Sequence, residues 1–315
     1  MIMIRDFQST EHEYLVIAGI EKVIWPENSS SASDFKFQDS ARDKSLAFQR
    51  VVVEQANEIV AFGHWRQKKI NGRYQIDISV HPDFERQGIG TAVFEHLFTK
   101  ISQSSPPVEI IEAYTYSHKP RAVAFLENRG FQPVMRWIIS TLDVAQFNVS
   151  LFQPLIDQVT KDIKIVPLPQ FMKQDPDWQR SLYELDWEIA QDEPLPYEPQ
   201  KPPFDLYCKH EFENPKQVMD AWHVAVANGR LVGMTQLFRS DDPTMFKNGF
   251  TGTVRSHRRL GLATVLKLHA IQYAQKTGIK LIRTGNEEKN PMYQLNQKLG
   301  FTALTINIAF EKRVG

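Results

Sequence analysis

One stretch of the sequence constrains the fold more than any other, because it leaves no spare residues between a strand, a glycine turn and a helix. It is IDISVHPDFERQGIGTAVFEHLF, residues 76–98. Apolar side chains alternate with polar ones up to Val80, which predicts a half-buried strand that Pro82 ends. Apolar positions then recur at helical spacing, so one face of the helix can pack on the sheet.

The turn between this strand and helix contains Gly88 and Gly90. Glycine tolerates positive φ and lets a ligand approach the bare backbone. The first amides of a helix have no partner within the helix and carry the positive end of its dipole. The turn therefore predicts a site for a phosphate group, although a single turn of this kind fits an ordinary strand-to-helix connection equally well.

A second copy of the turn makes the phosphate site the better interpretation. Residues 249–271, GFTGTVRSHRRLGLATVLKLHAI, place Gly261 and Ala263 where the first copy has its two glycines. Each copy is followed, at nearly equal spacing, by a helix that closes on Gly and enters a strand through Phe: AVAFLENRGF at 122–131 and MYQLNQKLGF at 292–301. The interval between the copies is the length of a domain, so the sequence predicts two similar domains.

Neither turn is one of the two common phosphate loops. No Gly-Lys-Ser/Thr follows, and Val93 stands where the dinucleotide-binding fold has its third glycine. The remaining pattern, Val-x-Pro followed by Arg86-x-Gly-x-Gly, resembles the acetyl-CoA loop of the GNAT N-acetyltransferase family. The tandem arrangement is similar to that of mycothiol synthase. The resemblance implies an α/β (α+β) fold of two tandem GNAT-like acyl-CoA N-acyltransferase domains, each a mixed, mostly antiparallel sheet flanked by helices.

The expected domains are residues 1–150 and 161–315, joined by a linker at about 151–160, where LFQPLIDQVTKD shows no strong periodicity. The first domain is expected to begin with a strand and an amphipathic helix that buries Leu15, Ile20, Val23 and Ile24. Residues 28–40 read as a polar loop. Residues 221–238 predict a hairpin, because Asn228-Gly229 suits a type I′ turn.

The resemblance implies that both loops bind the pyrophosphate of acetyl-CoA, as a cosubstrate. In the first loop the residues expected to bind it are Val80, Arg86, Gln87, Gly88, Ile89, Gly90 and Thr91. In the second they are Val254, Arg258, Arg259, Leu260, Gly261, Leu262 and Ala263. Glu85 would repel a pyrophosphate in the first loop, and Ala263 replaces a glycine in the second. The charged residues favour the second loop as the site for acetyl-CoA, whereas the glycine content favours the first. Tandem members of the family indicate that one half can catalyse while the other is structural or a degenerate binder.

The family resemblance also implies direct attack of an amine on the thioester. Asp77 is the candidate base, with a solvated strand residue as the alternative interpretation. The tyrosine that commonly protonates the thiolate is replaced by Leu126 and Asn296, and neither is an acid. Tyr293 shares the helical face of Asn296, so Tyr293 and Asn296 are the remaining candidates in the second half. In the first half Tyr114 and Tyr116 border the equivalent cleft, and core packing is the alternative for all these rings.

Composition narrows the remaining classes of function. The 37 basic and 37 acidic residues balance, which argues against nucleic acid and anionic membranes as partners. The one cysteine, Cys208, is expected to be structural in a cytoplasmic protein, and the N-terminus lacks the apolar run of a signal peptide. The histidines are scattered singly, so no metal site is expected.

The sequence as a whole predicts an N-acetyltransferase that moves acetyl from acetyl-CoA to the amine of a small molecule or peptide, as a monomer or homodimer. Acidic residues in the Pro-rich segment 191–203, Asp192 among them, suggest a cationic acceptor. Two alternatives stay open: a catalytically degenerate acetyl-CoA-binding sensor or interaction module, and an acyl or aminoacyl transferase of the same architecture.

Overall fold

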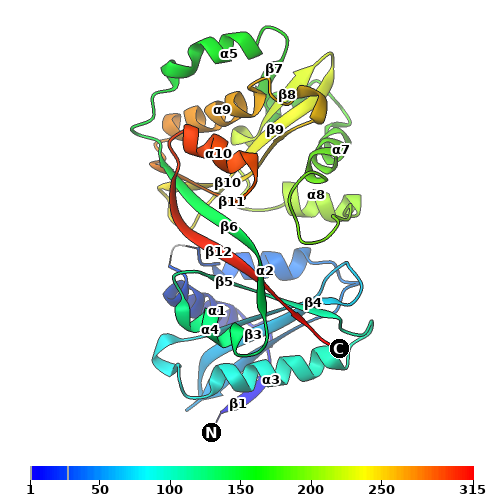
Figure 1. Cartoon of the computed structure of the whole chain (residues 1–315), viewed down its shortest axis with the longest axis vertical. Coiled ribbons are helices and arrows are strands. Elements are labelled where there is room, and N and C mark those ends of the chain that lie inside the picture. Colours follow the sequence, from blue (N-terminus) through cyan, green and yellow to red (C-terminus); the bar gives the residue numbers. More distant parts are fainter. Residues whose placement is uncertain (1, 27) are drawn as a thin grey trace. The chain divides into compact units, whose positions relative to one another are not determined.

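The computed structural model describes residues 2–26 and 28–315. The chain divides into two compact units, each described here by itself (Figure 1). Unit 1 comprises Met1–Arg136 and Asn307–Gly315, and unit 2 comprises Trp137–Ile306. Within the described residues, every helix is too short or too polar to cross a bilayer.

Unit 1 is a mixed sheet with helices on both faces. The order of its strands is β1-β2-β3-β4-β5-β12, and every printed pair is antiparallel except β4 with β5. Its elements are β1 (Met3–Asp6), α1 (Glu11–Ile24), α2 (Ala32–Ala41), β2 (Phe48–Gln55), β3 (Glu58–Gln67), β4 (Arg73–Val80), the short helix η1 (Pro82–Phe84), α3 (Ile89–Ser102), β5 (Ile110–Tyr116), α4 (Pro120–Glu127) and the end of β12 (Thr302–Arg313).

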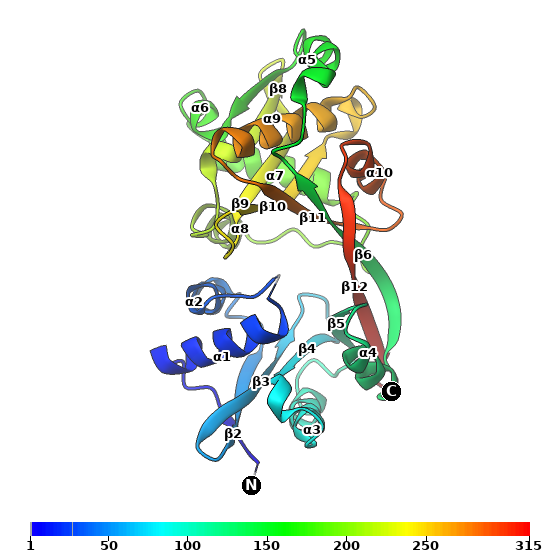
Figure 2. The ribbon, with the colours of Figure 1, turned by 90° about the vertical axis from the view of Figure 1, so that its left-hand side faces the viewer.

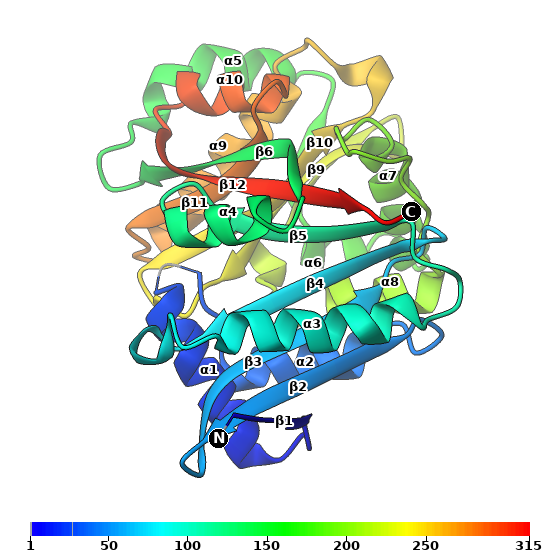
Figure 3. The same cartoon turned by 60° about the horizontal axis from the view of Figure 1, so that its bottom comes forward.

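Helices α1 and α2 cover one face of this sheet and α3 covers the other (Figures 2 and 3). On the α3 face, Val93 and Leu97 pack directly over Gly63, where a larger residue would collide with them. On the opposite face α1 and α2 share a core with the sheet, formed by Tyr14, Ile17, Ile20, Phe35, Val52 and Phe62. The two helical layers leave the carboxyl end of β4 between them.

Two local predictions for this unit are wrong. Leu15 and Val23 are 57% and 53% exposed, because α1 buries Tyr14 and Ile17 in their place, whereas Ile20 is buried as expected. Residues 28–40 are not a loop throughout, since α2 begins at Ala32. A capping box starts this helix: the Ser31 side chain accepts from the amide of Asp34, whose carboxylate accepts from the amide of Ser31.

Unit 2 repeats this plan with the strand order β6-β11-β10-β9-β8-β7, in which only β10 and β11 pair in parallel. Its elements are β6 (Gln132–Asp143), η2 (Val149–Phe152), α5 (Gln153–Val159), β7 (Lys164–Pro167), α6 (Leu168–Met172), α7 (Trp178–Ala190), α8 (Phe204–Phe212), η3 (Met219–Ala221), β8 (His223–Ala227), β9 (Arg230–Arg239), β10 (Met245–Thr253), η4 (Arg255–His257), α9 (Leu262–Lys276), β11 (Leu281–Glu287), α10 (Pro291–Lys298) and the start of β12.

Opposite faces of this second sheet carry α9 and α7. Leu266 of α9 packs over Gly233, and Ile189 of α7 packs over Gly252. The hairpin between β8 and β9 confirms the sequence prediction, because Asn228 and Gly229 adopt φ of 50° and 75°. The unit therefore has the same layered order as unit 1.

The compact units depart from the expected boundary at residues 151–160. That segment contains α5, whose Leu155 and Ile156 pack against the core of unit 2. The chain changes unit earlier, within β6, and returns within β12. Residues 307–313 of β12 pair with β5 in unit 1, while residues 137–143 of β6 pair with β11 in unit 2. Strand pairing joins residues far apart in sequence, so local periodicity does not reveal this exchange.

Candidate active site

The parallel strands β4 and β5 of unit 1 separate partway along their length. They pair only at Arg73, Tyr74 and Gln75, opposite residues 110–112. From Ile76 onward β4 keeps its antiparallel partner β3 but loses β5. A gap therefore opens in the sheet at the end of β4, next to the turn that leads into α3.

Amides of β4 point into this gap. The His81 amide donates to the Val60 carbonyl at 2.9 Å, and Val80 is the next residue back, opposite Ala61. Hydrogen-bonded pairs alternate along an antiparallel ladder. Val80 and Ile78 therefore turn their amides away from β3, toward the side where β5 has separated, and can donate to a ligand there.

The turn after β4 is open at its glycines. Gly88 has φ of 80°, and nothing lies within 4 Å of where a Cβ on it would stand. Gly90 approaches the Phe125 ring of α4, whose Cε2 would be 3.4 Å from an added Cβ. The described residues offer no hydrogen-bond acceptor to the backbone amides of residues 86–91. These amides at the start of α3 form a cradle for an anion.

Two arginines of α4 and its C-terminal turn make the surroundings of this cradle more positive. Arg121 forms an ion pair with Glu85 at 2.7 Å, so the carboxylate that would repel a phosphate is neutralised. Arg129 donates to the Thr91 hydroxyl at 2.7 Å, and its guanidinium lies over the Phe125 ring. The basic partners that the loop sequence lacks thus come from a segment further along the chain.

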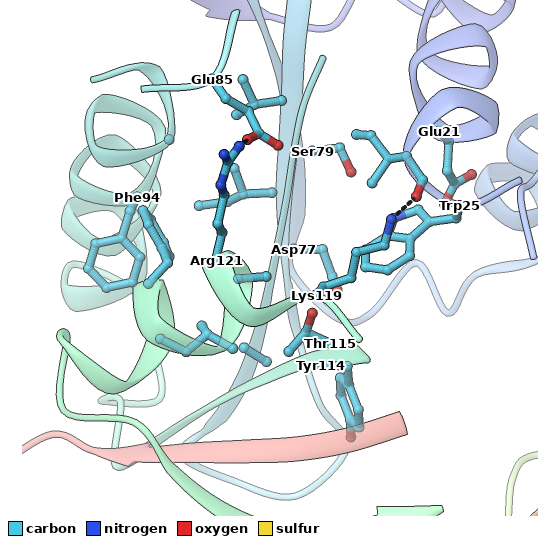
Figure 4. Close-up of a pocket in the computed structure, with 18 of the residues that line it drawn as sticks. Glu21, Trp25, Asp77, Ser79, Glu85, Phe94, Tyr114, Thr115, Lys119 and Arg121 are labelled. Atoms are coloured by element: carbon cyan, nitrogen blue, oxygen red, sulfur yellow. Dashed lines mark hydrogen bonds and ion pairs between the residues drawn. The ribbon is translucent and has the colours of Figure 1, made fainter. Parts of the chain in front are cut away.

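A cavity of about 1150 Å³ runs from this cradle through the gap in the sheet (Figure 4). Its lining includes Gly88 and Phe125 from the α3 and α4 side and Glu21, Asp77 and Trp25 from the α1 side. Every lining residue belongs to unit 1. An elongated ligand can therefore enter at the cradle and meet a second molecule on the opposite face.

Two carboxylates line the α1 side of the cavity with different electrostatics. Burial raises the pKa of Glu21, against hydrogen bonds from Ser30, and the charge of Asp77 raises it further. Burial alone would raise the pKa of Asp77, but His64, 3.1 Å away, lowers it by its charge and hydrogen bond. Glu21 is thus the better proton acceptor near neutral pH, and Asp77 is the more persistent negative charge.

Aromatic and hydroxyl groups complete the cavity. The Trp25 and Tyr116 rings pack 5.3 Å apart, and Lys119 lies over Trp25 while donating to the Ile24 carbonyl. The Tyr116 hydroxyl accepts from Asn28 at 3.1 Å. The Thr115 hydroxyl is buried on β5 without a hydrogen-bond partner among the described residues, so it can donate to a group in the cavity (Figure 4).

The second cradle has the same backbone but is covered. Gly261 has φ of 83°, yet Leu155 of α5 occupies the space beside it: Cδ1 lies 2.6 Å from where a Cβ would stand. The Val254 amide donates to the Val232 carbonyl just as the His81 amide donates to the Val60 carbonyl in unit 1, so this bond does not distinguish the two cradles. The residues Arg259, Leu260, Leu262 and Ala263 complete this covered turn, with Leu262 buried.

Charged side chains near the second cradle form ion pairs with one another. Asp192 forms ion pairs with Arg255 and Arg258, and the hydrogen bond from Arg255 is the main reason that its pKa falls to about 2. Lys267 of α9 is buried and donates to Asn248 Oδ1 at 2.5 Å, just past the residues at which β10 pairs with β11. Counted from the loop glycine, Lys267 has the position that Phe94 has in α3.

The candidate acid positions of the second half are not among the residues that line the cavity of unit 1. Asn296 is fully buried, and its amide donates to Asn286 Oδ1 at 2.5 Å. Tyr293 is half-buried on the same helix, α10. In unit 1, Leu126 lines the cavity where the resemblance implied a tyrosine, and Tyr114 and Tyr116 line it as expected.

Sequence reasoning found both cradles but missed Glu21, His64 and Leu155. The hydrophobic pattern of α1 would have revealed Glu21 only if the correct buried face had been chosen. His64 could have been inferred from a hairpin register that places it opposite Asp77. Nothing in the sequence indicates that Leu155 covers Gly261.

Two family comparisons match the chain. Residues 47–133 match the Acetyltransferase (GNAT) domain, and residues 180–301 match the Acetyltransferase (GNAT) family. No curated protein sequence matches the chain.

Solved structures share the fold over the whole chain. A tandem GNAT protein from the clavulanic acid biosynthesis pathway is 18% identical with a TM-score of 0.78, covering 100% of this chain and 99% of its own. A GCN5-related N-acetyltransferase from Sphaerobacter thermophilus is 15% identical with a TM-score of 0.70, covering 100% and 96%. These likenesses confirm the expected fold of tandem mixed, mostly antiparallel sheets flanked by helices.

Proposed function

Because this chain belongs to the GNAT acetyltransferase family and carries two such domains in tandem, we propose that unit 1 transfers acetyl from acetyl-CoA to an amine. The observation that carries the proposal is the cavity of unit 1. It joins an open cradle of backbone amides to a pair of carboxylates through the gap between β4 and β5. The shape and the chemistry match a phosphate-bearing thioester at one end and an amine at the other.

The cradle would hold the pyrophosphate of acetyl-CoA on the amides of residues 86–91. Arg86 and Arg129 line the same cavity and add positive charge. The amides of Ile78 and Val80 would hold the pantetheine arm and polarise the thioester carbonyl, since they point into the gap. Fixed donors of this kind stabilise the oxygen as negative charge develops on it.

Glu21 would act as the general base. Its raised pKa suits a group that must take a proton from an ammonium and release it afterwards. The neutral amine then attacks the carbonyl carbon, the carbon–sulfur bond breaks, and the amide product forms. The leaving thiolate needs a proton donor, and we assign this role to the Thr115 hydroxyl, one of the buried groups of the lining without a hydrogen-bond partner among the described residues.

The acceptor we propose is a small cationic amine or the amine of a peptide. Asp77, held ionised by His64, attracts the ammonium. The acidic segment 191–203 does not support this role, because Asp192 is paired with Arg255 and Arg258. The single cysteine supports a cytoplasmic location.

Unit 2 is proposed not to bind acetyl-CoA. Leu155 lies beside Gly261, and the buried Lys267 donates to Asn248, the residue just past those at which β10 pairs with β11. The same backbone device would then serve as a binding site in one unit and as structure in the other.

Calorimetric titration with acetyl-CoA, followed by a thiol-release assay over a panel of primary amines, tests the proposal. We expect one acetyl-CoA per chain and amine-dependent release of CoA. Binding without transfer to any amine would favour the sensor, an alternative that Leu126 in place of a tyrosine supports. Absence of binding would refute both.

A further inference from the structure

Two carboxylates line the acceptor side of the unit 1 cavity. Glu21 belongs to α1 and Asp77 to β4, and these two elements pack against each other (Figure 4). Within the described residues, Glu21 forms no ion pair and accepts from the Ser30 amide at 2.9 Å. Lys119, the lysine of this lining, donates to the Ile24 carbonyl and to neither carboxylate. The balancing positive charge must therefore come from a ligand.

Asp77 is held in one orientation by a chain of hydrogen bonds. Arg66 donates to Gln75 Oε1 from Nε at 3.0 Å and from Nη2 at 2.6 Å. The other end of this amide, Nε2, therefore faces Asp77 and donates to its Oδ2 at 2.7 Å. His64 Nε2 lies 3.1 Å from the same oxygen. Asp77 Oδ1 has no partner among the described residues, and the side chain is 31% exposed, so this oxygen is available to a ligand.

Further hydrogen-bond acceptors line the cavity. Once His64 has lost its charge, its Nε2–H donates to Asp77 and its Nδ1 presents a lone pair. This Nδ1 is buried without a partner among the described residues, and so is Asn307 Oδ1. Strand β12 places Asn307 opposite Tyr116, whose ring packs on Trp25. The lining thus suits a ligand that is rich in N–H groups.

The proposed reaction leaves one of the two negative charges unmatched by a monoamine. An amine attacks only after it has given its proton to Glu21, so the reacting nitrogen is neutral and no longer balances Asp77. A partly buried charge without a partner is costly, and a second cationic nitrogen in the acceptor removes that cost. Building on the proposed function of unit 1, we propose that the acceptor is a diamine: Glu21 takes the proton of one nitrogen, and Asp77 Oδ1 binds the ammonium at the other end.

Acetylation of a diamine leaves a single charge on the product. The acylated nitrogen becomes a neutral amide, the thiolate leaves as CoA, and the proton taken by Glu21 passes to solvent. For a second transfer, the amide end would have to occupy the site beside Asp77, where it has no charge to offer. We therefore expect mass spectrometry to find one acetyl group per diamine. A doubly acetylated main product would overturn the proposal.

Binding to the full chain in excess CoA tests the proposal without relying on turnover. Calorimetric titration at about pH 9, where alkylamines keep their charge, compares α,ω-diamines of about three to six carbons with the amino alcohols of the same length. We expect at least one diamine to bind at least about tenfold more tightly than its amino alcohol, because an ammonium bonds a carboxylate more strongly than a hydroxyl does. Equal affinities at every length would overturn the proposal.

Two matched variants locate the second ammonium. Asp77→Asn should reduce the preference for the diamine to about twofold, the statistical advantage of two equivalent ends. Asp83→Asn makes the same chemical change shortly after β4, at a side chain that is 82% exposed and outside the cavity lining, and should keep the preference. A preference that survives Asp77→Asn would overturn the proposal.

Turnover separates the diamine proposal from the proposed function. Release of CoA with equal kcat/KM for diamines and amino alcohols would overturn the diamine proposal and leave acetyl transfer standing. Preferential binding of diamines, lost in Asp77→Asn and without CoA release from any amine, would support the diamine site and refute acetyl transfer.

Discussion

Leu155 lies against Gly261, with its Cδ1 2.6 Å from where a Cβ on that glycine would stand, whereas the equivalent space at Gly88 is open. The two turns have nearly the same backbone, with φ of 83° and 80° at these glycines. A side chain from α5 therefore makes the difference between a covered and an open cradle.

A matched pair of substitutions tests which cradle binds acetyl-CoA. Thr91 and Thr264 each lie three residues after their loop glycine. Thr91→Glu should weaken acetyl-CoA binding at least about tenfold, because it places a carboxylate beside the amides that hold the pyrophosphate. Thr264→Glu should leave the affinity unchanged in the same calorimetric titration. Equal losses in both variants would show that unit 2 binds the cosubstrate too.

Glu21→Gln should lower kcat by roughly 10²- to 10⁴-fold while acetyl-CoA affinity is retained, because the glutamine cannot accept a proton. In the unsubstituted protein the rate should fall as pH drops through the raised pKa of Glu21, since the protonated carboxyl is no longer a base. This acid limb should start above the usual glutamate range and vanish in the variant. A pH profile unaltered by the substitution would assign the base elsewhere.

Asp77→Asn should raise KM for the amine more than it lowers kcat, because Asp77 attracts the ammonium but does not take its proton. Its pKa is lowered by His64, so the carboxylate stays charged in the working range. Steady-state kinetics with the amine varied at saturating acetyl-CoA measure the two parameters separately. A loss confined to kcat would give Asp77 a part in the chemical step.

Lys267→Met should stabilise the protein by about 1–4 kcal/mol at pH 6. Burial lowers the pKa of Lys267 to about 7, so below that pH the folded protein must hold a buried ammonium. Between pH 7 and 10.5 the unfolded chain binds a proton that the folded one does not, so stability of the unsubstituted protein rises with pH in this window. Urea denaturation should show the advantage of methionine shrinking by pH 9.5.

The exposed Lys276 on the same helix supplies the control for this experiment. Lys276→Met should change stability by less than about 0.5 kcal/mol at either pH. A destabilised Lys267→Met protein would show that the bond from Lys267 to Asn248 outweighs the cost of burying the charge.

Arg73→Leu should destabilise unit 1 by about 3–5 kcal/mol. Arg73 bonds both Glu112 of β5 and Glu311 of β12 at 2.8 Å, so its removal leaves two poorly solvated carboxylates side by side. Arg313→Leu changes an exposed residue on β12, the strand that contains Glu311, and should have little effect on stability. The midpoint of chemical denaturation measures the stability of both variants. Equal midpoints for the two variants would show that the buried ion pairs of Arg73 do not stabilise β12.

Much of the fold could be predicted because its causes are local. The predicted hairpin forms around Asn228-Gly229, and the helices predicted within residues 122–131 and 292–301 are α4 and α10. The error in α1 arose because its buried face depends on which sheet the helix meets, which distant residues decide. The compact units likewise depend on which strands β6 and β12 join.

The sequence alone determined that two strand–turn–helix devices with unpaired amides exist, since glycine at positive φ and helical periodicity are properties of neighbouring residues. The tertiary structure decided which one is open. Leu155 approaches Gly261 from another helix, Arg121 neutralises Glu85 from α4, and His64 faces Asp77 across a ladder. Such pairings depend on how separate elements pack in space, and this packing cannot be read from the order of residues along the chain.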